Sequence, residues 1–319
     1  MKKIYFTLLL LLVILSFISI FIGVSTMTLS EVLQGDSNQL QILLISRVPR
    51  LLSILITGVG MSISGLIMQQ LTRNRFVSPT TAATINFAQL GMLLGMMFFA
   101  RATIFHRMVF SFICSVLGSF LFMGIMRRIK FQNTLFVPLI GMLLGNVVSS
   151  ITTFIAYQNN LVQNISSWTQ GSFTNVLRGN FELVYLGIPF IIIAFLYANK
   201  FTIAGMGEDF SKNLGLNYNS VVSVGVIIIS LITSSIVVTV GSIPFIGLIV
   251  PNIVTMWLGD NLKTNLGITA IVGALFLLVC DIASRLIIFP FEVSISLTVG
   301  VVGSVIFLIL IMRRKSHEV

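Results

Sequence analysis

The charged residue best placed for chemistry inside a membrane is Asp281, the one acid of nine that lies well within a long apolar run. Arg285 follows one helical turn later, on the same face of any helix through this run. A charge at mid-membrane costs about 2.5–3.5 kcal/mol on insertion scales, so such a residue is retained for a purpose such as a proton relay. Because a cation stands one turn away, the spacing favours a local ion pair over a proton route.

Residue patterns for catalysis are missing from the sequence. A phosphate-cradling loop needs Gly, four residues, then Gly-Lys-Ser or Gly-Lys-Thr, and no lysine stands in that setting. No nucleophile, base and orienting residue cluster together, and His106 and His317 are too isolated to suggest a metal site. The sequence therefore predicts no catalytic residue, no metal and no bound cofactor. It is not expected to be an enzyme, and any ATP must be hydrolysed by a partner subunit.

The composition predicts an all-α polytopic membrane protein. Of 319 residues, 56% are hydrophobic and only 9% are charged, which excludes an ordinary soluble domain. Ten apolar windows of roughly sixteen to twenty residues could cross or nearly cross a bilayer. They are Tyr5–Val24, Leu51–Leu71, Ile85–Ala100, Met108–Met126, Leu135–Tyr157, Leu183–Ala198, Val221–Val240, Ile243–Leu258, Gly267–Phe289 and Val293–Met312.

The distribution of positive charge predicts the orientation. With the N-terminus inside and ten crossings, 13 of the 19 Lys and Arg residues fall in the cytoplasm, in keeping with the positive-inside rule. The sequence thus predicts a multi-pass protein of the cytoplasmic membrane with both termini in the cytoplasm. The six basic residues on the other side are Arg47, Arg50, Arg101, Arg107, Arg178 and Arg285.

The polar segment 199–220 separates two apolar windows and should lie at a membrane face. Glu208 and Asp209 suit the first turn of a short helix, and Gly215 suits its end. Phe210 and Leu214 lie four residues apart and give this helix two apolar knobs. An amphipathic helix on the inner leaflet is the alternative, but such helices are usually basic on their polar face.

The segment Leu71–Thr84 is polar and contains Pro79, so part of it cannot continue the preceding helix. Non-helical backbone at membrane depth is tolerated only where protein or a watery path surrounds it. We expect this segment to re-enter the membrane against protein, with its Ser and Thr side chains satisfying freed backbone groups.

A resemblance covers nearly the whole chain. The sequence resembles the FecCD/BtuC-type permeases of ABC importers, in motifs from the outer Arg47-Val48-Pro49-Arg50 to the closing glycines. These motifs also include Ser64-Gly65 with Gln69, Trp168 with Gly171-Ser172, Glu208-Asp209 to Leu214-Gly215, Gly241 to Pro251, Gly259-Asp260, Asp281, Arg285 and Gly300–Gly303. The resemblance implies a single permease domain, residues 1–319, with the BtuC-like fold of about ten helices.

The same resemblance implies partners and sites. The permease would pair with a second permease subunit, identical or related, and with two cytoplasmic ATPase subunits. The segment 199–220 would be the coupling helix in an ATPase cleft, with Gly207, Glu208, Asp209, Phe210, Leu214 and Gly215 as its residues. An extracytoplasmic binding protein would dock its acidic residues on Arg47 and Arg50, which are therefore expected to be exposed, and, less closely matched, on Arg285. Without the resemblance, lipid head groups are the simpler interpretation of these arginines.

The resemblance further places the transport pathway at the permease dimer axis. Asn146, Ser149, Ser150 and Thr153 form one polar stripe on the fifth window, at helical spacing. Pore lining is our hypothesis, although close helix packing also favours small polar residues.

Two departures from the family pattern bear on function. The usual Pro-His of the eighth helix is Pro251-Asn252, and Thr255 replaces an Arg, so the roles of those side chains do not carry over. The loop that begins at Arg73 resembles the corresponding loop of the permease subgroup that carries catecholate and mixed catecholate siderophores such as petrobactin or anguibactin. Ferric siderophore is the expected cargo, with haem or cobalamin as alternatives. An ion-coupled secondary carrier is the alternative from another class.

Overall fold

The computed structural model of the chain is a helical bundle, and it describes residues 2–23, 36–99, 103–128, 136–259 and 261–315. Asp260 of the family motif lies outside these ranges. In chain order the elements are α1 (Lys2–Phe21), α3 (Ser37–Ile42), the π-helical turn η1 (Leu43–Arg47), α4 (Val48–Thr72), α5 (Thr84–Phe98), α6 (Ile104–Arg128), α7 (Phe136–Gln158), α8 (Val162–Thr169), the 3₁₀ turn η2 (Glu182–Leu186), α9 (Gly187–Gly205), α10 (Glu208–Asn213), α11 (Tyr218–Val240), α12 (Ile246–Leu258), α13 (Leu262–Leu286) and α14 (Ile295–Lys315).

The helices confirm the expected all-α membrane architecture. Each of the ten apolar windows overlaps a helix, and none of the described residues forms a named strand. Within the described ranges, 8 helices are long and apolar enough to cross a bilayer. The helices α5 and α12 are shorter, with 15 and 13 residues. The chain is therefore a multi-pass membrane protein.

The two short helices α5 and α12 each begin after a stretch of non-helical backbone that is at least partly buried, and this stretch shortens the helix. Ala83 and Phe245, the residues just before α5 and α12, adopt left-handed φ values of 62° and 66°. The segment before α5 packs against protein, as expected for Leu71–Thr84, since Val77 and Ser78 are fully buried; its re-entry into the membrane stays a prediction. Its backbone is satisfied locally: Thr81 Oγ1 accepts a hydrogen bond from Ser78 N–H at 2.9 Å.

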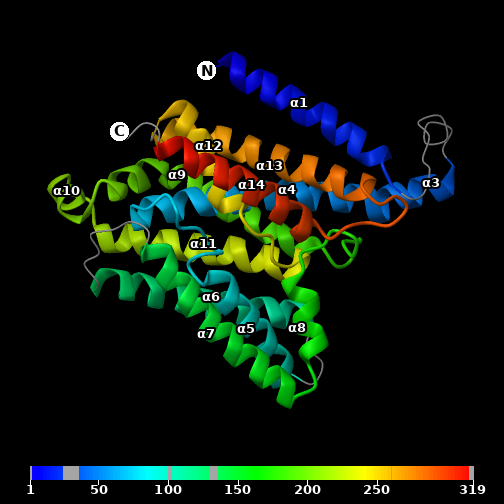
Figure 1. The fold of residues 1–319 in the computed structure, drawn as a ribbon, viewed down its shortest axis with the longest axis horizontal. Coiled ribbons are helices and arrows are strands. Elements are labelled where there is room, and N and C mark those ends of the chain that lie inside the picture. Colours follow the sequence, from blue (N-terminus) through cyan, green and yellow to red (C-terminus); the bar gives the residue numbers. More distant parts are fainter. Residues whose placement is uncertain (1, 24–35, 100–102, 129–135, 260, 316–319) are drawn as a thin grey trace.

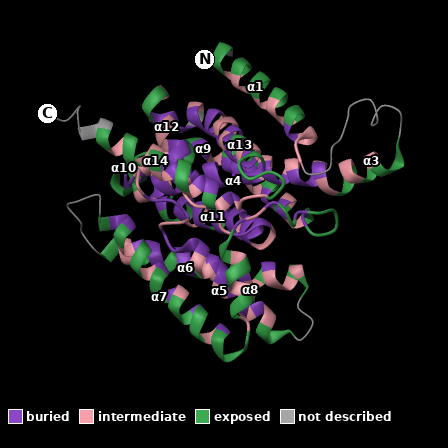
Figure 2. Cartoon of the chain, turned by 45° about the vertical axis from the view of Figure 1, so that its right-hand side comes forward, coloured by how far each residue is buried: buried purple, intermediate pink, exposed green. Residues whose placement is uncertain are grey.

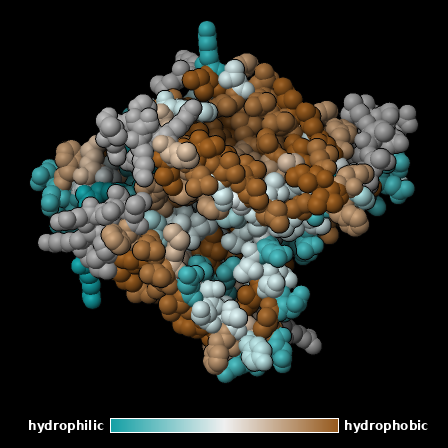
Figure 3. Space-filling model, viewed as in Figure 1, coloured by the Kyte–Doolittle hydropathy of each residue, from teal (hydrophilic) through white to brown (hydrophobic). Residues whose placement is uncertain are grey.

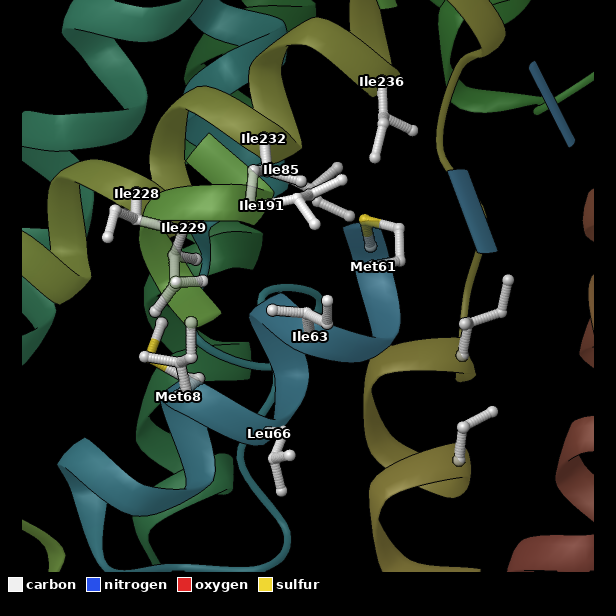
Figure 4. Packing of buried hydrophobic residues seen from close by; sticks show 14 of the residues in the cluster. Met61, Ile63, Leu66, Met68, Ile85, Ile191, Ile228, Ile229, Ile232 and Ile236 are labelled. Atoms are coloured by element: carbon white, nitrogen blue, oxygen red, sulfur yellow. The ribbon is translucent and has the colours of Figure 1, made fainter. Parts of the chain in front are cut away.

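The core of the molecule is formed by α4 and α11 (Figure 2), for each of which 72% of the apolar window is buried. Met61, Ile63 and Met68 from α4 pack near Ile229 and Ile232 of α11 (Figure 4). The helix α12 approaches α4 more closely still. A Cβ added at Gly65 would lie 1.8 Å from the carbonyl oxygen of Gly247, so the backbones of α4 and α12 touch where they cross.

The bundle has two distinct ends (Figure 1). The N-terminus, α10 and the C-terminal end of α14 lie at one end, whereas α3, α8 and the start of α4 lie at the other, here called the outer end. Hydrophobic side chains cover the middle of the face in Figure 3, and hydrophilic ones gather around α10. At the periphery α1 runs beside α13, with only 6% of its window buried.

Candidate functional site

Five charged side chains meet at the outer end of the bundle, and we call them the outer charge cluster. They are Arg47 of η1, Arg50 of α4, Asp281 and Arg285 of α13, and Glu292 between α13 and α14. Arg50 is the centre of the cluster. Its Nη2 lies 2.8 Å from Asp281 Oδ1, and its Nη1 donates to both carboxylate oxygens of Glu292, at 2.9 and 2.8 Å. The guanidinium of Arg50 thus bridges two acids, one on each side.

The pairing of Asp281 with Arg285, expected from their spacing, is confirmed. Arg285 Nη2 lies 2.6 Å from Asp281 Oδ2, in an ion pair whose angles do not meet those of a hydrogen bond. Asp281 is buried and shares its charge between Arg50 and Arg285. Because three arginines face two acids, the outer charge cluster has a net charge of about +1, which suits a structural network better than a proton relay.

The other contacts of these arginines hold the end of α1. Arg285 donates from Nη1 to the carbonyl oxygens of Ser19 and Ile22, at 2.9 and 2.6 Å, and Arg47 donates to the same Ile22 carbonyl at 2.6 Å. The last carbonyls of a helix have no partner within it and form the negative end of its dipole. Two arginines therefore cap α1, which has few other buried contacts.

One expectation about the outer arginines is wrong. The sequence placed Arg47 and Arg50 as exposed side chains, but each is only 8% exposed, and Arg285 is 3% exposed. The reason is that the two acids and the end of α1 surround them, and these come from segments distant in sequence. Glu292 was missed altogether, since no local pattern links it to Arg50.

Glu292 also connects the cluster to another outer segment. Its Oε2 accepts a hydrogen bond from Thr174 Oγ1 at 2.9 Å. Burial alone would raise the pKa of this carboxyl, but the charge and hydrogen bonds of Arg50, followed by the Thr174 hydrogen bond, lower it below its ordinary value. Glu292 is therefore charged at neutral pH and joins the start of α4 to the segment around Thr174.

At the opposite end, α10 has the start and the end expected from sequence. Gly207 precedes it with φ of 120°, and Gly215 follows it with φ of 73°, conformations that side chains disfavour. Glu208 and Asp209 occupy its first turn. The sequence missed Ser211, whose buried hydroxyl donates to the carbonyl oxygens of Gly207 and Ile203 at 2.6 and 3.0 Å and anchors α10 to α9.

The outward face of α10 carries the two apolar knobs. Phe210 is 48% exposed and Leu214 is 59% exposed. Beside them, Lys212 Nζ lies 2.8 Å from Glu208 Oε1 in a solvent-exposed pair, and the hydrogen bond from Lys212 lowers the pKa of Glu208. Exposed aromatic and aliphatic side chains on a short anchored helix are suited to insertion into a partner's cleft.

A polar cleft of about 280 Å³ lies beside α10, between the ends of α4, α9 and α12. Its lining residues are Gln69, Gln70, Arg73, Asn74, Arg75, Thr202, Gly205, Met206 and Thr255. Next to it, Asn252 donates from Nδ2 to the carbonyl oxygens of Arg75 and Leu248, at 2.8 and 2.7 Å. The amide that replaces the family's histidine thus ties α12 to the loop before α5.

The polar stripe on α7 faces away from the core of the chain. Asn146, Ser150 and Thr153 are exposed and Ser149 is half-buried, while the helix packs through its opposite face. Ser150 and Thr153 donate to carbonyl oxygens of their own helix, each at 2.9 Å. The stripe is separate from the outer charge cluster and from α10. Packing within the chain therefore does not account for its small polar residues.

Potential metal ligands do not gather anywhere in the described part of the chain. Those residues include no group of three His, Cys, Asp or Glu side chains able to hold an ion.

The fold and its two polar ends define the class of the protein. In the described part of the chain, eight helices long and apolar enough to cross a membrane and the two shorter apolar helices α5 and α12 form the bundle of a multi-pass membrane protein. The sequence model of the FecCD transport family matches residues 10–313, and the chain belongs to this family.

Individual relatives agree with this assignment. The chain is 54% identical over 307 residues to the petrobactin import system permease protein YclN of Bacillus subtilis, covering 96% of this chain and 97% of that protein. It is 40% identical to the ferric-anguibactin transport system permease protein FatD of Vibrio anguillarum, over 84% of this chain and 85% of that one. The solved structure of a metal-chelate type ABC transporter in an inward-facing conformation matches 98% of this chain, with a TM-score of 0.83 and 25% identity.

Proposed function

We propose that the chain is the permease subunit of an ABC importer that carries a ferric siderophore of the petrobactin or anguibactin class across the cytoplasmic membrane. The observation that carries this proposal is the 54% identity to a petrobactin permease, maintained over almost the full length of both chains. Identity at this level, without large gaps in coverage, supports a shared cargo class as well as a shared fold.

The two ends of the bundle support distinct partners. An ATPase subunit binds α10, because Phe210 and Leu214 are exposed on a helix fixed by Ser211. A siderophore-binding protein docks at the outer end, where the outer charge cluster has an excess of positive charge. The N-terminus and the end of α14 share the end of α10 and so lie in the cytoplasm. The ATP is bound and hydrolysed by the partner.

The pathway runs between two permease subunits, each contributing its α7 stripe. Asn146, Ser149, Ser150 and Thr153 present small polar groups on a face that this chain leaves uncovered. A pathway for a hydrophilic chelate needs such a surface, whereas lipid does not.

The experiment is uptake of radioactive iron by a Bacillus strain without its own petrobactin permeases. The strain expresses this chain together with a second permease subunit, an ATPase subunit and a binding protein of a petrobactin import system. Ferric petrobactin should be taken up with saturable, ATP-dependent kinetics, and ferric anguibactin is compared in parallel. The matched control carries an ATPase subunit without its catalytic glutamate.

Labelled haem and cobalamin are offered to the same cells. Uptake of either one without uptake of ferric siderophore would replace the proposed cargo, and uptake that persists with the inactive ATPase would support an ion-coupled carrier instead.

A further inference from the structure

The hydrogen bonds of Arg50 leave little capacity for an external ligand. Its Nε and Nη2 both donate to Asp281 Oδ1, at 3.3 and 2.8 Å, and its Nη1 is shared by both oxygens of Glu292. A guanidinium offers five N–H donors in a fixed planar fork. Each edge of the fork already faces a carboxylate, so an incoming acid can bind this arginine bidentately only if one of the two leaves.

The two internal acids differ in how readily they could leave. Asp281 has a side chain that is 1% exposed, lies within α13 and also pairs with Arg285. The Glu292 side chain is 17% exposed and lies in the connection between α13 and α14. Removal of Asp281 would leave two buried arginines without their shared acid, whereas removal of Glu292 leaves Arg50 paired on its inner side. Glu292 is the exchangeable partner.

We propose that Glu292 is an internal competitor at the outer docking surface, and that a carboxylate of an acidic partner protein binds Arg50 by displacing it. The inference rests on the proposed function, which supplies that partner as the siderophore-binding protein. An exchange of one carboxylate for another keeps the buried arginine neutralised throughout.

The exchange has a structural consequence because Glu292 also accepts the hydrogen bond of Thr174. The segment containing Thr174 is held by the start of α14, where Ser294 and Ser296 contact the backbone of Gly171 at 2.8 and 2.6 Å. When Glu292 leaves Arg50, the link that runs from Thr174 through Glu292 to the start of α4 is lost, while the hydrogen bond from Arg178 N–H to the Ile45 carbonyl oxygen at 2.9 Å remains. Docking is thereby coupled to release of one connection across the outer end.

The first test measures the affinity of the siderophore-binding protein for the permease complex in nanodiscs. Glu292→Gln keeps the shape of the side chain and removes its charge. In the parent protein, Arg50 without Glu292 is expected to be populated at about 10% or less. The variant should then bind the siderophore-binding protein at least about ten-fold more tightly than the parent. Glu182→Gln is the matched control, since Glu182 is an exposed outer glutamate whose Oε1 accepts the N–H of the nearby Gly179. It makes the same change in net charge and should leave affinity unaltered.

A second measurement needs no binding protein and so separates this inference from the proposed function. Phenylglyoxal modification of Arg50, quantified by mass spectrometry on the permease complex, should increase in Glu292→Gln and stay at the parent level in Glu182→Gln. Unchanged Arg50 reactivity, or weaker binding in Glu292→Gln than in Glu182→Gln, would overturn the competitor role. Raised reactivity without siderophore uptake by the parent would leave the competitor role standing and remove the cargo proposal.

Discussion

The outer charge cluster and α10 are both surfaces at which a soluble partner is proposed to bind, yet they are built in opposite ways. Arg47 and Arg50 at the outer end are each 8% exposed and already hold internal partners. Phe210 and Leu214 of α10 are about half exposed and project from the bundle. Binding at the outer end therefore requires exchange of existing contacts, whereas binding at α10 only adds new ones. Substitutions in the outer charge cluster should consequently affect folding, whereas substitutions on α10 should affect only the coupling to the proposed ATPase.

The largest effect on stability is expected from Asp281→Asn. Loss of this acid leaves Arg50 and Arg285 without the charge that they share, and breaking a buried pair in this way costs about 3–5 kcal/mol. The purified protein should unfold at a clearly lower temperature in detergent. Asp36→Asn, at the exposed cap of α3, is the control and should change nothing. Equal unfolding temperatures for the two variants would contradict the claim that folding depends on the outer charge cluster.

A smaller loss is expected from Arg50→Lys, which preserves the charge but not the planar fork. A lysine cannot contact Asp281 and both oxygens of Glu292 in the same geometry, and hydrogen bonds to charged groups contribute about 1.5–3 kcal/mol each. The unfolding temperature of the variant and its affinity for the binding protein should both decrease. If affinity falls while stability stays at the parent value, the arginine serves docking alone and the outer end resembles α10 more than we propose.

Replacement of both Phe210 and Leu214 by Ser should leave folding intact and abolish transport. Exposed side chains away from special contacts usually alter stability by no more than about 0.5 kcal/mol. Without its knobs, however, α10 should lose the proposed contact through which the ATPase moves α9 and α11. ATP hydrolysis stimulated by cargo and iron uptake are the measurements, with expression and thermal unfolding as controls. Normal uptake by the double variant would remove the coupling role.

The smallest effect is expected from Glu208→Gln. The lowered pKa of Glu208 means that its pair with Lys212 is formed above the ordinary carboxyl pKa and is lost as pH falls through the lowered value. Both side chains of the pair are exposed to solvent, which screens their interaction. Parent and variant should therefore unfold at indistinguishable temperatures at neutral pH. A clear difference would show that charge at α10 matters as it does at the outer end.

Local sequence patterns were sufficient for the helices and for the internal organisation of α10. Apolar windows define the crossings, and Gly207, Gly215 and the acids at 208 and 209 define a short helix without reference to any distant residue. The pair of Asp281 and Arg285 was also predictable because it lies within one helical turn.

Contacts between distant segments could not be predicted in the same way. The bond between Arg50 and Glu292 joins residues 242 positions apart, and the cap on α1 joins Arg285 to a helix 266 positions earlier. Spacing along the chain gives no information on such pairs. The arginines were consequently interpreted as exposed, although their burial follows directly from the partners that the fold brings to them.

The amide of Asn252, which ties α12 to the loop before α5, has a consequence for the cell. An asparagine side chain has no proton that it gains or loses in the physiological range, whereas an imidazole changes charge between about pH 5 and 8. This contact lies near the polar cleft beside α10, and a change in pH cannot alter the charge of its amide. A fall in pH at that end of the bundle should thus leave this contact unaltered.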